Sequence, residues 1–452
     1  MGETSILLLS IIYFITAIFY IALEIHWVYK YKRIRTIAYV RFLYSLIYGF
    51  LPALVHSHVY LTGETVARIS YSQTGIMQLY ILYILSVVVY FFLSLGYRIS
   101  SSTNVKNNKQ KVGIASEKLF AASLIILLIG FLSFFMWTLA YGSLFGVMEY
   151  AKVLRSGVAV INNPFSFMKR TSTLMIFSSY MFFAVLLNLP KGIGPKKITV
   201  FILFSFSSFW SMIYLLSNDG RMSFIYFFLI FILYAVFNKQ SKSENINIRN
   251  TSIKISIWLI IAFIAMALSD WIMYFFRNGE SRTAEVSFNI FEMIREELGY
   301  TILSGQVSLT ALVNGDAGDR ILVDALSTLF AFLPSRFRPD GIVTLFSYNT
   351  ELVGNTTGTV PTDLLSMCIY NLGIVGVCLI PIFLGWIIRK IENVITTNRG
   401  NVYYDMLYII VSLYLARFLA YADPANYVHA ILFIIIGHVT VIVISATKFS
   451  KL

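Results

Sequence analysis

The run LFAASLIILLIGFLSFFMWTLAY, residues 119–141, contains no charged side chain. A stretch of about 20 apolar residues is long enough to cross a bilayer as an α-helix. Similar runs recur along the whole chain, which is 58% hydrophobic and only 13% charged. That balance excludes an ordinary soluble domain, and continuous runs without alternation exclude a membrane β-barrel. The sequence therefore predicts an all-α polytopic membrane protein.

Eleven membrane-spanning helices are predicted from these runs. They lie near residues 5–29, 37–59, 77–97, 119–141, 171–188, 198–217, 222–238, 255–276, 363–388, 403–421 and 428–447. The chain then divides into spans 1–8 over residues 1–275, a long polar segment over 276–362, and spans 9–11 over 363–452. We call residues 276–362 the large insert.

The basic residues sort the loops onto two sides of the membrane. One set of alternate short loops carries 21 of the 35 lysines and arginines, most of them lysine. The positive-inside rule assigns that set to the cytoplasm. The large insert then lies outside the cytoplasm, with the N-terminus outside and the C-terminus inside. The net charge of +13 reflects this rule, so no nucleic-acid partner is expected.

The large insert has a distinctive charge pattern. It contains no lysine and no histidine, and its six basic residues are all arginine: Arg277, Arg282, Arg295, Arg320, Arg336 and Arg338. The planar guanidinium suits bidentate contacts with phosphate. The alternative is that these arginines anchor the insert at the interface and pair with its ten acidic residues.

Local patterns predict some structure inside the large insert. Residues 289–302 have the apolar spacing of an amphipathic helix. Asp324 is a candidate cap for a second short helix that runs to Leu333. Residues 349–361 are rich in Asn, Thr and Gly and predict an ordered loop or a flexible lid.

Familiar catalytic motifs are missing from the sequence. There is no Walker A loop, no G-x-G-x-x-G turn, no H-E-x-x-H and no G-x-S-x-G. ATP hydrolysis is therefore not expected. No D-x-D pair is present to hold a metal-bound nucleotide sugar, so we predict no metal or other cofactor and, for any sugar transfer, a lipid-linked donor.

Four arginines form the predicted diphosphate-binding site: Arg221, Arg277, Arg336 and Arg338. Arg221 closes a tight turn between two spans, Arg277 ends the span before the large insert, and the other two lie shortly before the chain re-enters the bilayer. All four should lie near the outer interface. Preorganised cations there would stabilise the charge on a departing diphosphate. For Arg221, a simple interface anchor is the alternative.

Three short motifs accompany this layout: DGR at 219–221, RNG at 277–279, and GTVPTD at 358–363 followed by YNLGIVG at 370–376. With them the chain resembles the Wzy-type polymerases of O-antigen and related oligosaccharide repeat units, which are related to the O-antigen ligases. The resemblance covers most of the chain, but its motifs are short and degenerate.

The resemblance implies a fold like that of the C-type glycosyltransferases, in a bacterial inner membrane with a periplasmic active face. It also implies an activity. The enzyme would transfer a glycan from undecaprenyl diphosphate to the non-reducing end of another lipid-linked repeat unit. The expected partners are this lipid-linked oligosaccharide, membrane lipid, and a chain-length regulator and a flippase of the same pathway.

The general base is left open by the sequence. The ligases use a loop histidine, and the large insert has none, which favours a polymerase. His429 at the start of the last span is one of the few nearby histidines. Glu297, Glu351 and Asp363 are the acidic candidates, although each also fits a salt bridge or a helix cap. The competing functions are an O-antigen ligase, a flippase or other transporter for lipid-linked oligosaccharide, and a non-catalytic scaffold.

Overall fold

The computed structural model describes most of the chain. The described residues are 2–31, 34–66, 68–100, 114–150, 163–189, 194–218, 221–240, 290–331, 339, 342–354, 359–398 and 400–447. Within these ranges every regular element is helical. The chain divides into two compact units, which are treated separately below. Unit 1 comprises Met1–Asn108, Asn289–Val394 and Ser412–His429, and unit 2 comprises Lys109–Phe288, Ile395–Val411 and Ala430–Leu452.

Long apolar helices confirm the membrane class. Eight helices in the described ranges are long and apolar enough to cross a bilayer: Glu3–Lys30, Thr36–Thr62, Gln73–Ile99, Ser116–Tyr141, Met168–Asn188, Lys196–Ser217, Leu364–Thr396 and Pro424–Ala446. Each overlaps a predicted span. Of the other three predicted spans, 222–238 contains the shorter apolar helix Ser223–Val236, 403–421 contains the helix Val402–Arg417, and 255–276 lies outside the described residues.

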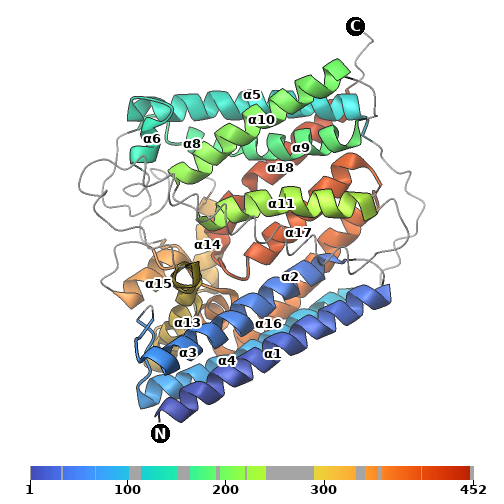
Figure 1. Ribbon diagram of the computed structural model, residues 1–452. Coiled ribbons are helices and arrows are strands. Elements are labelled where there is room, and N and C mark those ends of the chain that lie inside the picture. Colours follow the sequence, from blue (N-terminus) through green and yellow to red (C-terminus); the bar gives the residue numbers. More distant parts are fainter. Residues whose placement is uncertain are drawn as a thin grey trace. The chain divides into compact units, whose positions relative to one another are not determined.

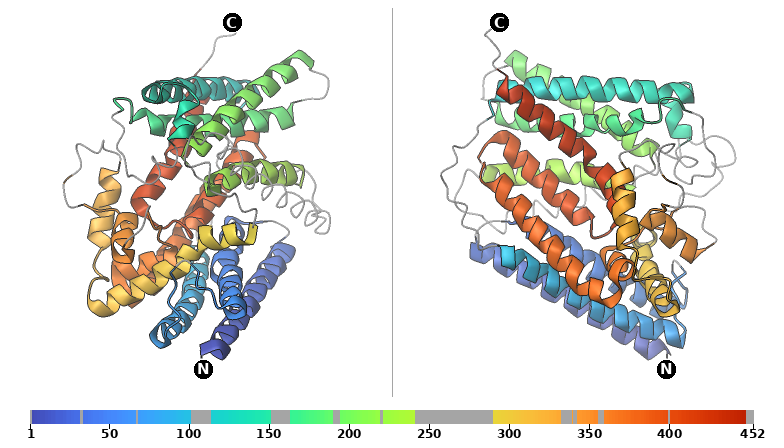
Figure 2. Two further views of the ribbon diagram at one scale, coloured as in Figure 1. Left: turned by 60° about the vertical axis from the view of Figure 1, so that its left-hand side comes forward. Right: turned by 180° about the vertical axis from the view of Figure 1, so that it is seen from behind.

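Unit 1 is built on a group of long helices that run side by side (Figures 1 and 2). They are α1 (Gly2–Tyr31), α2 (Thr36–Ser45), η1 (Leu46–Phe50), α3 (Leu51–Thr62), α4 (Gln73–Ile99) and α16 (Leu364–Thr396). The π-helical turn η1 lies beside Pro52, which has no N–H to donate to the preceding turn. The consecutive segments α2, η1 and α3 therefore form one continuous helical rod despite the proline, which we call the α2–η1–α3 rod.

Glycines let α4 and α16 cross closely in unit 1. A Cβ at Gly96 would collide with the carbonyl of Ile382, and one at Gly385 would collide with the carbonyl of Leu93. Small residues at such crossings allow backbones to approach in membrane proteins, where helix association depends on close packing. The two glycines thus fix where α16 lies against α4.

The large insert contributes three helices to unit 1: α13 (Ile290–Asn314), α14 (Ile321–Phe330) and α15 (Leu345–Val353). Helix α13 packs against α3 and α4. These helices and the loop 63–72 mark what we call the insert end of unit 1 (Figure 1). The opposite end, where α1 and α4 finish and α2 begins, carries Arg35, Arg98 and Arg389, and we call it the basic end.

The helices of the large insert correct three local predictions. Helix α13 continues to Asn314, beyond the predicted end at residue 302. Helix α14 begins at Ile321, so Asp324 lies in its first turn and is not the cap, which is Arg320. Residues 345–353 form helix α15, where a loop was predicted from residue 349 onward. The Thr344 side chain caps α15 by accepting a hydrogen bond from the Ser347 N–H. Thr is a typical helix-capping residue, but in this Asn- and Thr-rich segment it does not stand out as one.

Unit 2 is organised around three helices that lie side by side: α5 (Ser116–Thr138), α9 (Leu174–Asn188) and α10 (Gly194–Ser217). Its remaining elements are η3 (Leu139–Tyr141), α6 (Gly146–Glu149), α8 (Met168–Thr171), α11 (Arg221–Gln240) and parts of α17 (Val402–Arg417) and α18 (Pro424–Ala446). The rings of Phe183, Phe204 and Phe231 contact one another between α9, α10 and α11. A hydroxyl pair, Ser179 and Ser211, links α9 to α10 at 3.1 Å.

Candidate functional site

The predicted diphosphate site falls largely outside what the structure describes. Arg221 begins α11 in unit 2, but its side chain is not among the described groups. Arg277, Arg336 and Arg338 lie in segments 241–289 and 332–338, outside the described residues. The clamp of four arginines therefore stays a prediction.

The four candidate general bases all belong to unit 1. Glu297 is part of α13, and its side chain lies outside the described groups. Glu351 is exposed on α15, Asp363 is fully buried directly before α16, and His429 is partly buried in α18. The structure brings Glu351 and Asp363 into the same unit without direct contact between them.

Asp363 acts as the N-terminal cap of α16. It accepts hydrogen bonds from the backbone N–H groups of Leu365 and Ser366 and from the Ser366 hydroxyl. The hydroxyl of Tyr48, on η1, donates to its Oδ2 at 2.6 Å. Burial raises the pKa of the Asp363 carboxyl, and the hydrogen bonds from Ser366 and Tyr48 oppose that change. The carboxyl thus joins the α2–η1–α3 rod to the start of α16.

A second buried carboxyl joins the large insert to α16. Asp324, 2% exposed, accepts from Asn371 Nδ2 at 2.9 Å and from Arg320 Nη2 at 3.1 Å. The Arg320 guanidinium also lies 4.0 Å above the Tyr348 ring, and its Nη2 donates to the Val343 carbonyl. Burial raises the pKa of Asp324, and Arg320 opposes that rise. We call Arg320, Asp324, Tyr348 and Asn371 the junction.

The YNLG motif explains how α16 reaches the junction. Leu372 and Gly373 interrupt α16 with non-helical dihedrals, and Gly373 has φ +59° and ψ −145°. That combination is essentially restricted to glycine. Just before the break, the Tyr370 carbonyl accepts from the Gly318 N–H at 2.9 Å. The Tyr370 hydroxyl donates to Asn349 Oδ1 at 2.8 Å. Tyr370 thus forms hydrogen bonds with two separate parts of the large insert.

Asp423 provides a further connection in unit 1. It is fully buried and caps α18 through the N–H groups of Ala425 and Asn426. Its other oxygen, Oδ2, accepts from the Phe346 N–H at the start of α15, at 3.0 Å. The dipeptide Asp423–Pro424 is a typical helix start, so its capping role is predictable from sequence. Its hydrogen bond to α15 is not, because the two residues are 77 apart in the chain.

A polar pocket of about 260 Å³ opens at the insert end of unit 1. Its lining combines one arginine, one carboxylate and several amides and hydroxyls with aliphatic walls: Arg68, Ser70, Gln78, Leu303, Gln306, Val307, Thr310, Ala311, Asn314, Asp316 and Leu352. We call this the insert pocket. Its volume is close to the lower bound for small-molecule sites, about 300 Å³.

Hydrogen bonds hold the polar walls of the insert pocket in place. Gln306 on α13 exchanges two 2.9 Å bonds with the backbone of Ser70. Gln78 on α4 donates to Thr310 Oγ1 at 2.9 Å. Arg68 has a left-handed φ of +61° and donates to the Gly354 carbonyl after α15. The insert pocket is therefore preformed where loop residues 63–66 and 68–72 meet α4, α13 and α15.

Several acidic residues lie near Tyr348, a residue of the junction. The Tyr348 hydroxyl donates to the Asp316 carbonyl, and Asp316 also lines the pocket. Asp319 and Glu351 act electrostatically on Tyr348 together with Asp316. Glu351 precedes the pocket residue Leu352 on α15. Glu351 itself does not line the pocket.

Sequence reasoning missed the junction and the pocket. Arg320 was counted among the insert arginines without a role, and Asp324 was interpreted as a cap. Nothing local distinguishes Gln78 or Gln306 from other polar residues of apolar helices. Only the YNLG motif gave a signal, because a glycine within an apolar span often marks a break or a close contact.

Two further observations bear on chemistry. In the part of the chain that the structure describes, no three His, Cys, Asp or Glu side chains come close enough together to hold a metal ion. Cys368 and Cys378 are both unbridged. Comparison with protein families, curated proteins and solved structures finds no match to this chain.

Proposed function

We propose that the protein is a membrane glycosyltransferase that polymerises lipid-linked glycan repeat units. The donor would be an oligosaccharide on undecaprenyl diphosphate, and the acceptor the non-reducing end of another lipid-linked repeat unit. The reaction would occur on the periplasmic face of a bacterial inner membrane. A chain-length regulator and a flippase would be its partners in the pathway.

The insert pocket is the observation that carries this proposal. Sugar hydroxyls both donate and accept hydrogen bonds, and amides, hydroxyls, arginine and carboxylate are the side chains that match them. The insert pocket presents all four kinds at the ends of membrane helices, where a lipid-linked glycan would extend from the bilayer. A pocket for an apolar substrate would lack this lining.

The junction supports the same assignment. Its residues tie the YNLG motif, on which the family resemblance partly rests, to Arg320 and Asp324 of the large insert. The motif thus has a physical role at the edge of the candidate site.

Glu351 is the favoured general base among the four candidates. Its side chain is exposed on α15, one residue before Leu352 of the insert pocket, whereas the oxygens of Asp363 are occupied in capping α16. In the proposed step, the acceptor hydroxyl oxygen bonds to the anomeric carbon while the bond from that carbon to the diphosphate breaks. The hydroxyl proton passes to Glu351. The four predicted arginines would stabilise the departing diphosphate.

Gene deletion tests the pathway assignment. Loss of the protein should leave lipopolysaccharide with a single repeat unit in place of a ladder of lengths. Complete loss of O-antigen with accumulation of lipid-linked polymer would indicate a ligase. Accumulation of single repeats on the cytoplasmic side would indicate a flippase.

Substitutions test the site. Glu351→Gln should lower the polymerisation rate by about 10²–10⁴-fold, the range for loss of a general base. Glu117→Gln, an equivalent change at an exposed position of α5 in unit 2, is the matched control and should keep the full ladder. A full ladder from Glu351→Gln at normal protein level would remove Glu351 from the mechanism. The same outcome for Arg221→Ala and Arg277→Ala would refute the diphosphate clamp.

A further inference from the structure

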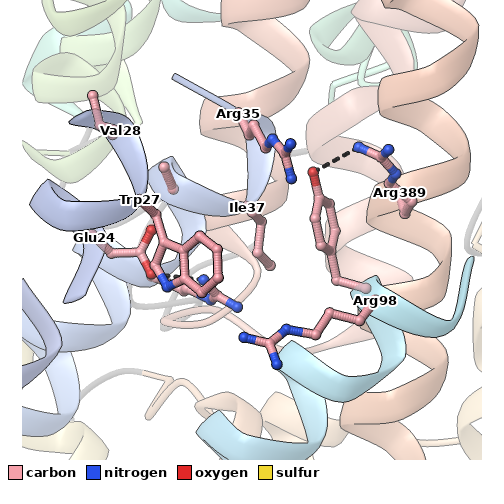
Figure 3. A pocket seen from close by; sticks show the side chains of 10 residues that line it. Glu24, Trp27, Val28, Arg35, Ile37, Arg98 and Arg389 are labelled. Carbon is pink, nitrogen blue, oxygen red and sulfur yellow. Dashed lines mark hydrogen bonds and ion pairs between the residues drawn. The ribbon is translucent and has the colours of Figure 1, made fainter. Parts of the chain in front are cut away.

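A second, larger cavity opens at the basic end of unit 1, away from the insert pocket. Its volume is about 420 Å³. Four arginines from different parts of unit 1 converge on it (Figure 3). The full lining is Glu24, Trp27, Val28, Arg35, Ile37, Ala38, Arg41, Tyr97, Arg98 and Arg389. We call this the arginine cavity.

Two of its guanidinium groups are fixed by carboxylates. Arg41 on α2 bonds Glu24 on α1 at 2.7 Å, and both side chains are at least nine-tenths buried. Arg389 on α16 donates to the Tyr97 hydroxyl at 3.0 Å and lies 3.6 Å from Glu392. These contacts orient each guanidinium fork.

The guanidinium groups of Arg41 and Arg389 have more N–H donors than these contacts use. Arg41 and Arg389 both make these contacts through Nη1, and Nε of each is buried without a hydrogen-bond partner among the described residues. Arginine has five N–H donors and no acceptor. The Nη2 group of each arginine is therefore the donor left for an anion, and its use would not release the contacts that hold the guanidinium.

The other charges leave the cavity positive. Arg98 on α4 is exposed and lies 5.4 Å from the Trp27 ring centroid, and Arg35 precedes α2 (Figure 3). Counting Glu392 with the lining, four guanidinium groups face two carboxylates. Lys30, 5.4 Å from the same ring, adds a further positive charge nearby. An anion would balance this excess.

We propose that the arginine cavity binds the phosphate group of an anionic membrane phospholipid. Guanidinium forks match phosphate oxygens in pairs. The cavity lies at the ends of candidate membrane helices, on the side that the charge distribution assigns to the cytoplasm. Anionic headgroups concentrate in that leaflet, and basic pockets between membrane helices bind them. Trp27 adds an aromatic ring of the kind enriched at the membrane interface.

Simple interface anchoring does not account for the geometry. Anchoring arginines extend separately toward the surface, each with its own surroundings. Here the arginines come from the residue before α2 and from α2, α4 and α16, and they share one cavity. The aliphatic side chains of Val28, Ile37 and Ala38 complete its wall and would contact the glycerol part of a lipid.

Thermal unfolding of the purified full-length protein in an uncharged maltoside detergent tests this proposal. Phosphatidylglycerol, phosphatidylcholine and inorganic phosphate are added separately. A ligand that binds the folded protein raises its unfolding temperature. We expect phosphatidylglycerol to raise it and phosphatidylcholine to leave it nearly unchanged. An equal shift with both lipids would overturn the proposal, and so would an equal shift with inorganic phosphate at the same concentration, because the anion would then be a soluble one.

Charge-removing variants locate the effect. Arg98→Gln should need about tenfold more phosphatidylglycerol for half of the stabilisation, since one charge-assisted contact is lost. Arg98→Lys, which keeps the charge without the fork, should fall between the wild type and Arg98→Gln. Lys197→Gln, the same charge change at an exposed residue of α10 in unit 2, is the control. A response of Arg98→Gln identical to that of Lys197→Gln would exclude the arginine cavity as the binding site.

Discussion

Asn371→Asp perturbs the junction with almost no change in shape. In the wild type, the Asn371 amide donates to Asp324 Oδ2 at 2.9 Å, and Asp324 is 2% exposed. The substitution replaces this donor with an oxygen. A buried hydrogen bond is thereby replaced by a buried contact between two carboxyl groups.

The expected loss is large. Two like charges about 4 Å apart repel by about 4 kcal/mol at an effective dielectric constant of about 20. Arg320 remains bonded to the other oxygen of Asp324 and moderates this repulsion. A net loss of about 3 kcal/mol in the free energy of unfolding follows, a substantial part of the roughly 5–15 kcal/mol that holds a protein folded.

The loss should depend on pH. The introduced carboxyl would raise the pKa of Asp324 further above its unfolded value, because the pair avoids double ionisation by keeping one proton. A carboxyl with a raised folded-state pKa favours the folded state below its ordinary pKa, and this advantage disappears as the pH rises through the raised value. The variant should therefore come closest to wild-type stability below about pH 4, the ordinary range of an aspartate pKa, and should lose stability relative to the wild type as the pH rises above it.

Thermal unfolding in detergent across this pH range provides the measurement. Asn371→Ala is the control, because it removes the hydrogen bond at a cost of about 1.5–3 kcal/mol without adding a charge. Its stability should fall with rising pH less steeply than that of Asn371→Asp, because it removes a hydrogen bond that lowers the pKa of Asp324 but adds no second carboxyl. If Asn371→Asp and Asn371→Ala lose equal stability throughout, Asp324 does not face residue 371 and the junction is wrong.

Three further predictions use the same unfolding assay. Gly373→Ala should lose about 1–3 kcal/mol, because φ +59° and ψ −145° strain any residue with a Cβ; unchanged stability would contradict the break in α16. Arg41→Gln should lose about 3–5 kcal/mol by leaving Glu24 buried without its ion pair, and a loss below about 1 kcal/mol would indicate an exposed pair. Tyr348→Leu should lose about 0.5–2 kcal/mol more than Tyr348→Phe, which keeps a ring beneath Arg320; equal losses would exclude the cation–π contact.

The membrane class was predictable because hydrocarbon imposes one requirement on every span. A long run without charge, such as residues 119–141, is sufficient evidence for a crossing helix, and α5 occupies it. The division into units was not predictable. Unit 1 takes its helices from three separate parts of the chain, and no feature of composition changes where one unit gives way to the other.

The site was harder to predict because its contacts are distant in sequence. Gln306 bonds Ser70 across 236 residues, and Asn371 bonds Asp324 across 47. Each of these residues is unremarkable in its own segment. Asp363 is a candidate base by sequence, and the structure shows it capping α16. Sequence alone does not separate the two roles, because an aspartate or glutamate carboxylate can serve in either.

The buried pair of Glu24 and Arg41 has a consequence for how the protein is made. The two residues are 17 apart and lie on the first two helices, so their charges can neutralise each other while the rest of the chain is still on the ribosome. An isolated charge within a bilayer is costly, and pairing would let this helical hairpin partition into the membrane early. The hydrogen-bond acceptor of the Tyr48 hydroxyl, Asp363, is synthesised only 315 residues later. A nascent chain stopped before α16 would therefore retain, inside its first hairpin, a tyrosine hydroxyl without this hydrogen-bond acceptor.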